Sequence, residues 1–306
     1  MGKREKLQDL TIKNNFLFGA VMCEEENCKG FLEMTLGFPI EQVEVSKEKS
    51  IVYHPEYKGI RLDVYAKDEN NTHYNVEMQV LKRAALGKRS RYYHSQIDME
   101  LLLKGKEYQD LPDTYVIFIC DFDPFGKKRY CYTFMNCCLE DKELKLRDGS
   151  ISIFLSTKGE NETEVSQELM NFLKFVSADL KESISDFQDP YVKQLQEAIS
   201  RIKSNREMEE RYMILRELLK DEYSEGMLLG REEGMLLGRE EGMLLGREEG
   251  KVEGKAEDIL DFLGDLGEVP DTLRDEIMLQ RDITILQRWL KLAAKAESII
   301  QFQEKM

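Results

Sequence analysis

Three absences narrow the possible functions of this chain of 306 residues. No stretch of about 18 consecutive apolar residues occurs, so we expect no membrane-spanning helix. The opening residues, MGKREKLQDL, lack the apolar core of a signal peptide, and Lys6 breaks the pattern for N-myristoylation. Together these features predict a cytoplasmic protein with no membrane partner.

Residues that bind transition metals or form catalytic triads are scarce. The three histidines are His54, His73 and His94, and their spacing indicates neither a triad nor a metal cluster. The six cysteines include no CxxC pair, so we interpret them as reduced thiols and not as zinc ligands.

The net charge of −15 at first argues against a nucleic-acid partner. The charge is unevenly distributed, however. Residues 1–160 hold 24 Lys and Arg against 26 Asp and Glu, a balance of −2, and residues 161–306 hold 20 against 33, a balance of −13, which together give −15. The acidity belongs to the C-terminal half, so the N-terminal half remains compatible with DNA.

Residues 60–80, IRLDVYAKDENNTHYNVEMQV, have the pattern of a β-hairpin with one apolar and one polar face. The apolar set is Ile60, Leu62, Val64, Ala66, Tyr74, Val76, Met78 and Val80. The polar set is Arg61, Asp63, Tyr65, Asn75, Glu77 and Gln79. Residues 68–72, DENNT, are turn formers and predict the connection between the two strands.

The register of this hairpin decides where its acids lie. A three-residue loop, residues 69–71, places Asp63 directly opposite Glu77, with Gln79 on the same face. A two-residue loop, residues 70–71, puts the two carboxylates on opposite faces of the sheet.

The acid pair has two interpretations. Like charges directly opposite each other destabilise a sheet by up to about 1 kcal/mol, and a divalent cation between them would reverse that effect. The first interpretation is therefore a metal site. The alternative is that Asp63, Glu77 and Gln79 lie on a solvated sheet face, where Arg61 neutralises the acids.

A positively charged segment follows the hairpin. Between Glu77 and Asp98 there is no acid, and this interval contains five cations and two tyrosines. These residues are Lys82, Arg83, Lys88, Arg89, Arg91, Tyr92 and Tyr93. They suit a phosphate backbone with base stacking on Tyr92; the alternative is a solvated start of a helix that the tyrosines pack.

The remaining patterns predict an α/β protein with a mixed sheet and a helical C-terminal region. Helices are expected over 7–37, 89–104 and 162–222, the last broken near Pro190, and strands over 43–53, 115–120, 130–135 and 151–155.

The sequence GMLLGREE occurs three times, beginning at residues 226, 234 and 242. Eight residues make about 2.2 helical turns, so the Met-Leu-Leu blocks form no fixed stripe. Each interior glycine lowers helix stability by roughly 0.5–1 kcal/mol. We expect a marginal helix for self-association or a flexible spacer that grew by repeat expansion.

These observations divide the chain into four segments. They are a core domain over 1–160, a helical extension over 161–221, the repeat over 222–256, and a small helical module over 257–306 that we expect to support dimerisation.

Five segments resemble the PD-(D/E)XK nuclease superfamily, and more closely the Rpn family of recombination-promoting nucleases and putative transposases. They are RLDV at 61–64, NVEMQ at 75–79, TIKNNFLFGAVM at 11–22, KRSRYYHSQID at 88–98 and TYVIFICDFDPF at 114–125. They follow the family's order over roughly the first half of the chain. The resemblance implies a restriction-endonuclease-like αβββαβ core.

The resemblance also implies a site. Asp63 and Glu77 match the acids that bind Mg²⁺, or alternatively Mn²⁺, and Gln79 would orient the attacking water. Family members often carry Asp where this chain has Asn15 and Lys where it has Gly19.

The implied function is a metal-dependent DNA endonuclease in recombination or mobile-element biology, acting as a homodimer or larger homo-oligomer. The alternative is a catalytically degenerate nuclease-fold protein that binds DNA or assembles with proteins. Asn15 and the Gln79 that replaces the superfamily's lysine favour this alternative.

Overall fold

The structure, a computed structural model, describes residues 6–47, 49–51 and 60–306. The chain divides into two compact units, Met1–Arg216 and Glu217–Met306. The predicted division into four segments is finer than this and stays a prediction.

A six-stranded mixed sheet forms the centre of the first unit, in the order β1-β4-β5-β6-β8-β7. Its strands are β1 (Val43–Lys47), β4 (Val64–Asp68), β5 (His73–Gln79), β6 (Thr114–Cys120), β7 (Cys131–Phe134) and β8 (Ser150–Ser156). Strands β5, β6 and β8 run parallel, and the other neighbours pair antiparallel. A separate two-stranded sheet joins β2 (Ser50–Ile51) to β3 (Ile60–Arg61).

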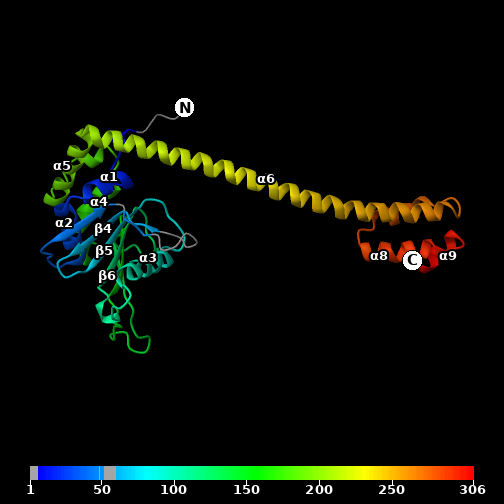
Figure 1. The fold of residues 1–306 in the computed structure, drawn as a ribbon, viewed down its shortest axis with the longest axis horizontal. Coiled ribbons are helices and arrows are strands. Elements are labelled where there is room, and N and C mark those ends of the chain that lie inside the picture. Colours follow the sequence, from blue (N-terminus) through cyan, green and yellow to red (C-terminus); the bar gives the residue numbers. More distant parts are fainter. Residues whose placement is uncertain (1–5, 48, 52–59) are drawn as a thin grey trace. The chain divides into compact units, whose positions relative to one another are not determined.

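Helices cover both faces of the six-stranded sheet (Figure 1). One face carries α1 (Asn15–Met22), α2 (Glu25–Leu36), α4 (Gln167–Ser177) and α5 (Pro190–Ser204), and the other carries α3 (Leu86–Leu101). Short 3-10 helices occur at Leu7–Asp9, Tyr108–Asp110, Glu162–Glu164 and Glu182–Ile184. The element order contains the αβββαβ core that the resemblance implies, so this fold prediction is confirmed.

The alternation of side chains along β5 separates two apolar clusters. Val76 and Met78 pack with α1, α2, α4 and α5, whereas Phe118 of the neighbouring strand packs with Tyr93 of α3. Because successive side chains of a strand point to opposite faces, Asn75 and Glu77 lie on the α3 side. The predicted polar face is therefore covered by a helix.

Turn chemistry sets the register between β4 and β5. The Asp68 carboxylate accepts the backbone N–H groups of Asn70 and Thr72 at 2.9 and 2.8 Å. Asn71 takes a left-handed conformation with φ of 62°, which asparagine tolerates better than most residues. The result is the three-residue loop that the sequence offered as one of two possibilities.

The observed register pairs Val64 with Val76, which confirms that Asp63 and Glu77 lie on one face. The first arm is not one continuous strand, however. Ile60 and Leu62 pack in the cluster below α3, on the opposite side of the sheet from Val64. The prediction of one shared apolar face is wrong here, because β3 pairs with β2 and the alternation stops at the break between β3 and β4.

Two other predicted elements are divided. The helix expected over 7–37 consists of a 3-10 turn followed by α1 and α2, because Asn14 accepts the N–H of Phe16 and starts a new helix there. Gly37, with φ of 77°, ends α2 as predicted. The strand expected over 43–53 is divided between β1 and β2, which belong to different sheets, and its last two positions lie outside the described residues.

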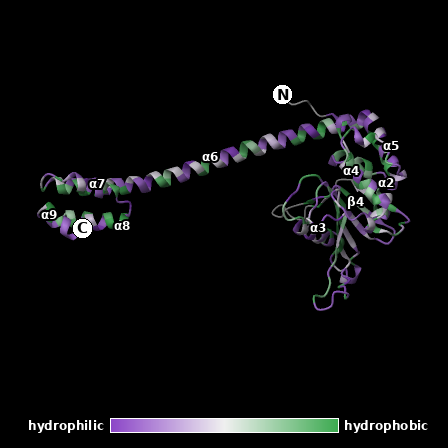
Figure 2. Ribbon diagram, turned by 180° about the vertical axis from the view of Figure 1, so that it is seen from behind, coloured by the Kyte–Doolittle hydropathy of each residue, from purple (hydrophilic) through white to green (hydrophobic). Residues whose placement is uncertain are grey.

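Helix α6 (Arg206–Gly264) begins in the first unit and contains the repeat. Hydrophobic and hydrophilic residues alternate along it (Figure 2). The side chains of the repeat are exposed. A methyl group added at any of the eight glycines from Gly226 to Gly254 would meet no described atom within 4 Å. The repeat is thus helical. Its Met-Leu-Leu blocks form no apolar stripe, because their position around the helix axis changes from one copy to the next, as predicted.

The second unit has its own small core. Helices α7 (Asp271–Leu279), α8 (Ile283–Ala293) and α9 (Ile299–Lys305) enclose Trp289 together with Ile259 and Leu263 from the end of α6. None of the helices in the described part of the chain is both long enough and apolar enough to cross a membrane.

Candidate active site

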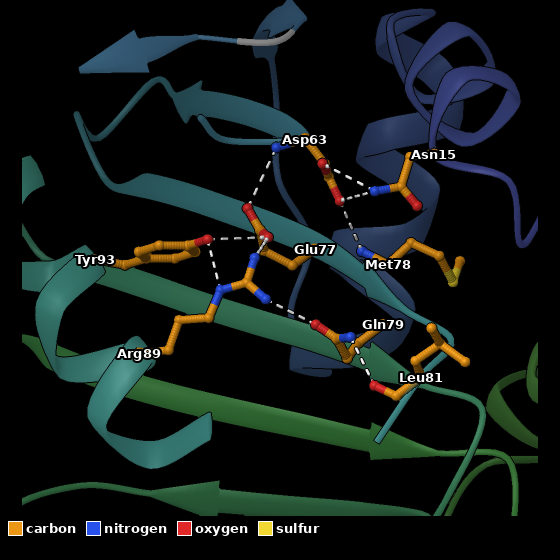
Figure 3. A network of polar contacts seen from close by, with 8 residues as sticks. All are labelled: Asn15, Asp63, Glu77, Met78, Gln79, Leu81, Arg89 and Tyr93. Carbon is orange, nitrogen blue, oxygen red and sulfur yellow. Dashed lines mark hydrogen bonds and ion pairs between the residues drawn. The ribbon is translucent and has the colours of Figure 1, made fainter. Parts of the chain in front are cut away.

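The two predicted metal-binding acids lie next to each other on the α3 side of the sheet (Figure 3). Glu77 is in the middle of the buried strand β5, and Asp63 directly precedes β4. The backbone N–H of Asp63 donates to Glu77 Oε1 at 3.3 Å, and the backbone N–H of Met78 donates to Asp63 Oδ2 at 3.2 Å. The hairpin backbone itself therefore fixes both carboxylates.

Arg89 reaches this pair from α3. Its Nη2 donates to Glu77 Oε2 at 2.6 Å, its Nη1 to Gln79 Oε1 at 2.7 Å, and its Nε to the Tyr93 hydroxyl at 2.7 Å. Tyr93 in turn donates to Glu77 Oε2 at 3.4 Å. Arg89 and Tyr93 are four residues apart on α3, so both project from the same face of the helix.

Asn15, from the first turn of α1, contacts the other acid. Its Nδ2 donates to Asp63 Oδ1 and Oδ2 at 3.3 and 3.2 Å. An aspartate at this position would repel Asp63, whereas an amide stabilises it. Rotation of the amide by half a turn would present an oxygen to the same place, so Asn15 can serve as a hydrogen-bond donor or as a neutral oxygen ligand.

Burial raises the pKa of both acids, and the charge of Asp63 raises the pKa of Glu77 further. Desolvation is the main cause for Asp63, and the N–H of Met78 and the charge of Arg89 oppose it. Burial, followed by the charge of Asp63, raises the pKa of Glu77, and Arg89 opposes this shift. The charged state of both acids is therefore unfavourable even beside Arg89.

The oxygen donors of this site fit a hard divalent cation, which takes carboxylate, amide and water oxygens. Within the described residues, no group of three or more His, Cys, Asp and Glu side chains is arranged to hold a metal ion. Asp63 and Glu77 would therefore need Asn15, waters or substrate oxygens to complete the coordination sphere.

A cleft of about 240 Å³ opens beside the acids, and its lining includes Asn15, Gln79, Arg83 and Arg89. Neither acid is among the lining residues of this cleft, nor among those of a larger cavity of about 520 Å³ between the N-terminal segment and α5. The smaller cleft is the better candidate for a substrate because two of its lining residues, Asn15 and Arg89, hydrogen-bond to Asp63 and Glu77.

The structure separates the members of the positively charged segment. Arg83 lines the cleft and Arg89 binds Glu77, whereas Tyr92 and Tyr93 pack in the cluster below α3. The remaining side chains are exposed, and they are Lys82, Lys88 and Arg91. Contact of any of these residues with DNA stays a prediction.

The alternative of a solvated acid face is wrong for Glu77 and Gln79, whereas Asp63 is only half-buried and the charge of Arg61 opposes the rise that desolvation causes in its pKa. Glu77 is 1% exposed and Gln79 is 6% exposed, because α3 covers them. The cation that pairs with Glu77 is Arg89, and Arg61 is exposed on the short strand β3. The signal for Arg89 was its spacing from Leu86 and Tyr93, which places all three on the inner side of one helix.

A mixed sheet with neighbouring acids on its covered face is the architecture of a PD-(D/E)XK nuclease core. Comparison with protein families matches residues 12–225, well over half of the chain, to the PD-(D/E)XK nuclease family transposase. The chain belongs to this family, which confirms the resemblance seen in its motifs. Neither the curated proteins nor the solved structures gave a match.

Proposed function

We propose that the protein is a metal-dependent endonuclease that hydrolyses phosphodiester bonds in DNA. One observation carries the proposal: Asp63 and Glu77 are held together beside a cleft that Arg83 and Arg89 border. Membership of a nuclease family supports DNA as the substrate class. The family's description as transposases supports a role in recombination or mobile-element biology.

Asp63 and Glu77 would hold Mg²⁺ or Mn²⁺, and Asn15 could add a neutral oxygen. Such a cation, when bound, polarises a phosphate and lowers the pKa of a coordinated water. Arg83 faces the cleft and would bind the phosphate backbone.

Gln79 uses both ends of its amide in this structure. Its Oε1 accepts from Arg89, and its Nε2 donates to the backbone oxygen of Leu81 at 2.8 Å. We assign it first a positioning role, because it fixes Arg89 and the start of the loop after β5. The amide retains a second N–H on Nε2 and a second lone pair on Oε1, with which it could orient the attacking water, as the resemblance implies.

A second candidate function is a catalytically degenerate nuclease-fold protein that binds DNA or assembles with proteins. The observation in its favour is that Arg89 and Asn15 already satisfy Glu77 and Asp63. In this case the acids would be structural, and the protein would neither bind a divalent cation nor cut DNA.

Cleavage of supercoiled plasmid separates the two candidates. The purified full chain is incubated with Mg²⁺, Mn²⁺ or EDTA, alongside Glu77→Gln and the control Glu44→Gln. Glu44 is an exposed acid on β1 that pairs with Lys67, so its loss should change stability by about 1 kcal/mol or less.

We expect metal-dependent nicking by the wild type and Glu44→Gln, and a loss of at least about 100-fold in Glu77→Gln. Cleavage in EDTA, or full activity of Glu77→Gln, would contradict the proposed site. Two nuclease units in a homo-oligomer would cut both strands, so we also expect linear product from the species that sediments as a dimer or larger.

A further inference from the structure

The guanidinium of Arg89 is fixed on three sides by side chains of the site. It donates to Glu77, Gln79 and Tyr93 at 2.6, 2.7 and 2.7 Å, and it lies over the Tyr93 ring at 5.0 Å from the centroid. The Arg89 side chain is 31% exposed and that of Glu77 only 2%, so the carboxylate is buried and the arginine reaches it from the cleft. Arg89 is therefore the resident cation of the acid pair.

The charges at this site cannot accommodate a second cation without a cost. Asp63 and Glu77 together carry two negative charges when ionised, and Arg89 offsets one of them. A divalent cation would reverse the sign of the total charge and place two positive groups on one buried carboxylate, where charges repel more strongly than in water.

The two carboxylate oxygens of Glu77 accept different hydrogen bonds. Oε2 accepts the short bond from Arg89 and a long one from Tyr93. Oε1 accepts one long bond, 3.3 Å, from the backbone of Asp63. A cation held by Asp63 would therefore meet Oε1 before Oε2, and it would compete with Arg89 for the charge of Glu77.

We propose that Arg89 and the divalent cation compete for Glu77, so that the arginine restrains metal binding until a phosphate enters the cleft. This inference rests on the proposed metal site at Asp63 and Glu77. A released Arg89 remains at the border of the cleft beside Arg83, where a guanidinium can bind phosphate through two parallel hydrogen bonds. The phosphate would thus take the place of Glu77 as the partner of Arg89.

Metal affinity of the DNA-free protein tests this competition directly. Mn²⁺ binding to the full chain is titrated by electron paramagnetic resonance for the wild type, Arg89→Gln and Arg91→Gln. Arg91 is exposed on the same helix, so its variant makes the same change in net charge without touching the acids. We expect Arg89→Gln to lower the Mn²⁺ Kd at least about fivefold, the lower end of ordinary coupling between sites, and Arg91→Gln to leave it unchanged.

The outcomes distinguish this inference from the proposed function. If the wild type binds Mn²⁺ as tightly as Arg89→Gln or more tightly, the competition is refuted while the metal site stands. If neither binds Mn²⁺, the metal site fails and the competition fails with it. Binding by Arg89→Gln alone would support the competition in its strongest form.

Arg89→Lys covers the case in which Arg89→Gln does not fold. A lysine keeps the positive charge but cannot bridge Glu77, Gln79 and Tyr93 with one planar group. We expect its Mn²⁺ Kd to be at least about twofold lower than that of the wild type, because the competitor is held less firmly. An unchanged or higher Kd in this variant would overturn the proposal.

Discussion

Asp63→Asn should stabilise the metal-free protein while it removes the proposed metal site. The substitution keeps an oxygen that can accept the N–H of Met78, and rotation of the Asn15 amide can satisfy the new Nδ2. It removes one of the two neighbouring negative charges. Functional sites commonly lower the stability of a protein in this way, so we expect the free energy of unfolding to increase when the site is disabled.

The repulsion between the two acids sets the magnitude. Two unit charges about 5 Å apart repel by roughly 3 kcal/mol at an effective dielectric constant near 20. Arg89 offsets part of this repulsion through its ion pair with Glu77. We therefore expect Asp63→Asn to raise the free energy of unfolding in EDTA by about 1–2 kcal/mol at pH 8.

The pH dependence follows from the raised pKa values of Asp63 and Glu77. An acid with a higher pKa in the folded protein binds more protons there, so stability falls as pH rises from its unfolded value towards its folded value. The metal-free wild type should lose stability from about pH 5 to pH 8. The advantage of Asp63→Asn should accordingly shrink on acidification to about pH 5.

The two units offer separate probes for this measurement. Among the 13 tyrosines, all but Tyr223 lie in the first unit, whereas the single tryptophan, Trp289, lies in the second. The urea midpoint followed by near-ultraviolet circular dichroism of tyrosine should be higher in Asp63→Asn than in the wild type. The midpoint followed by Trp289 fluorescence should be the same in both proteins. A loss of 1 kcal/mol or more in the tyrosine transition of Asp63→Asn at pH 8 would refute the electrostatic reasoning.

Two further predictions concern the backbone. Asn71→Val should destabilise the first unit by about 1–2 kcal/mol, because a β-branched residue is disfavoured at φ of 62°; the tyrosine signal would follow the melt, and an unchanged midpoint would contradict the assigned turn. Gly238→Ala should increase helicity and stabilise α6 by up to about 1 kcal/mol, because the added methyl meets no described atom within 4 Å. Reduced ellipticity in far-ultraviolet circular dichroism would show instead that this glycine packs against a partner.

Much of the hairpin could be predicted from sequence because local chemistry determines it. The strand alternation of β5 and the turn formers around Asn71 specify the observed register. The face of Ile60 could not be predicted, because it depends on pairing between β3 and β2. Strand β2 lies outside the hairpin, so its pairing with β3 cannot be predicted from the alternation within the hairpin.

The burial of the site also could not be predicted from the local sequence pattern. Asn75, Glu77 and Gln79 form a polar row, which on an isolated hairpin would face water. The packing of α3 buries all three. The linear clustering of cations likewise could not distinguish Arg89, which points inward, from Arg91, because that distinction requires the rotational phase of α3.

The placement of the cleft has a consequence for how the protein can diverge. The acids lie on or beside a central strand, where a substitution disturbs the core, but part of the cleft wall comes from the loop after β5. In that loop Leu81 is 70% exposed, and Arg83 is exposed as well. Surface substitutions of this kind usually change stability by no more than about 0.5 kcal/mol. Under the proposed function, substitutions in this loop would change substrate preference while the acid pair and the sheet that holds it stay the same.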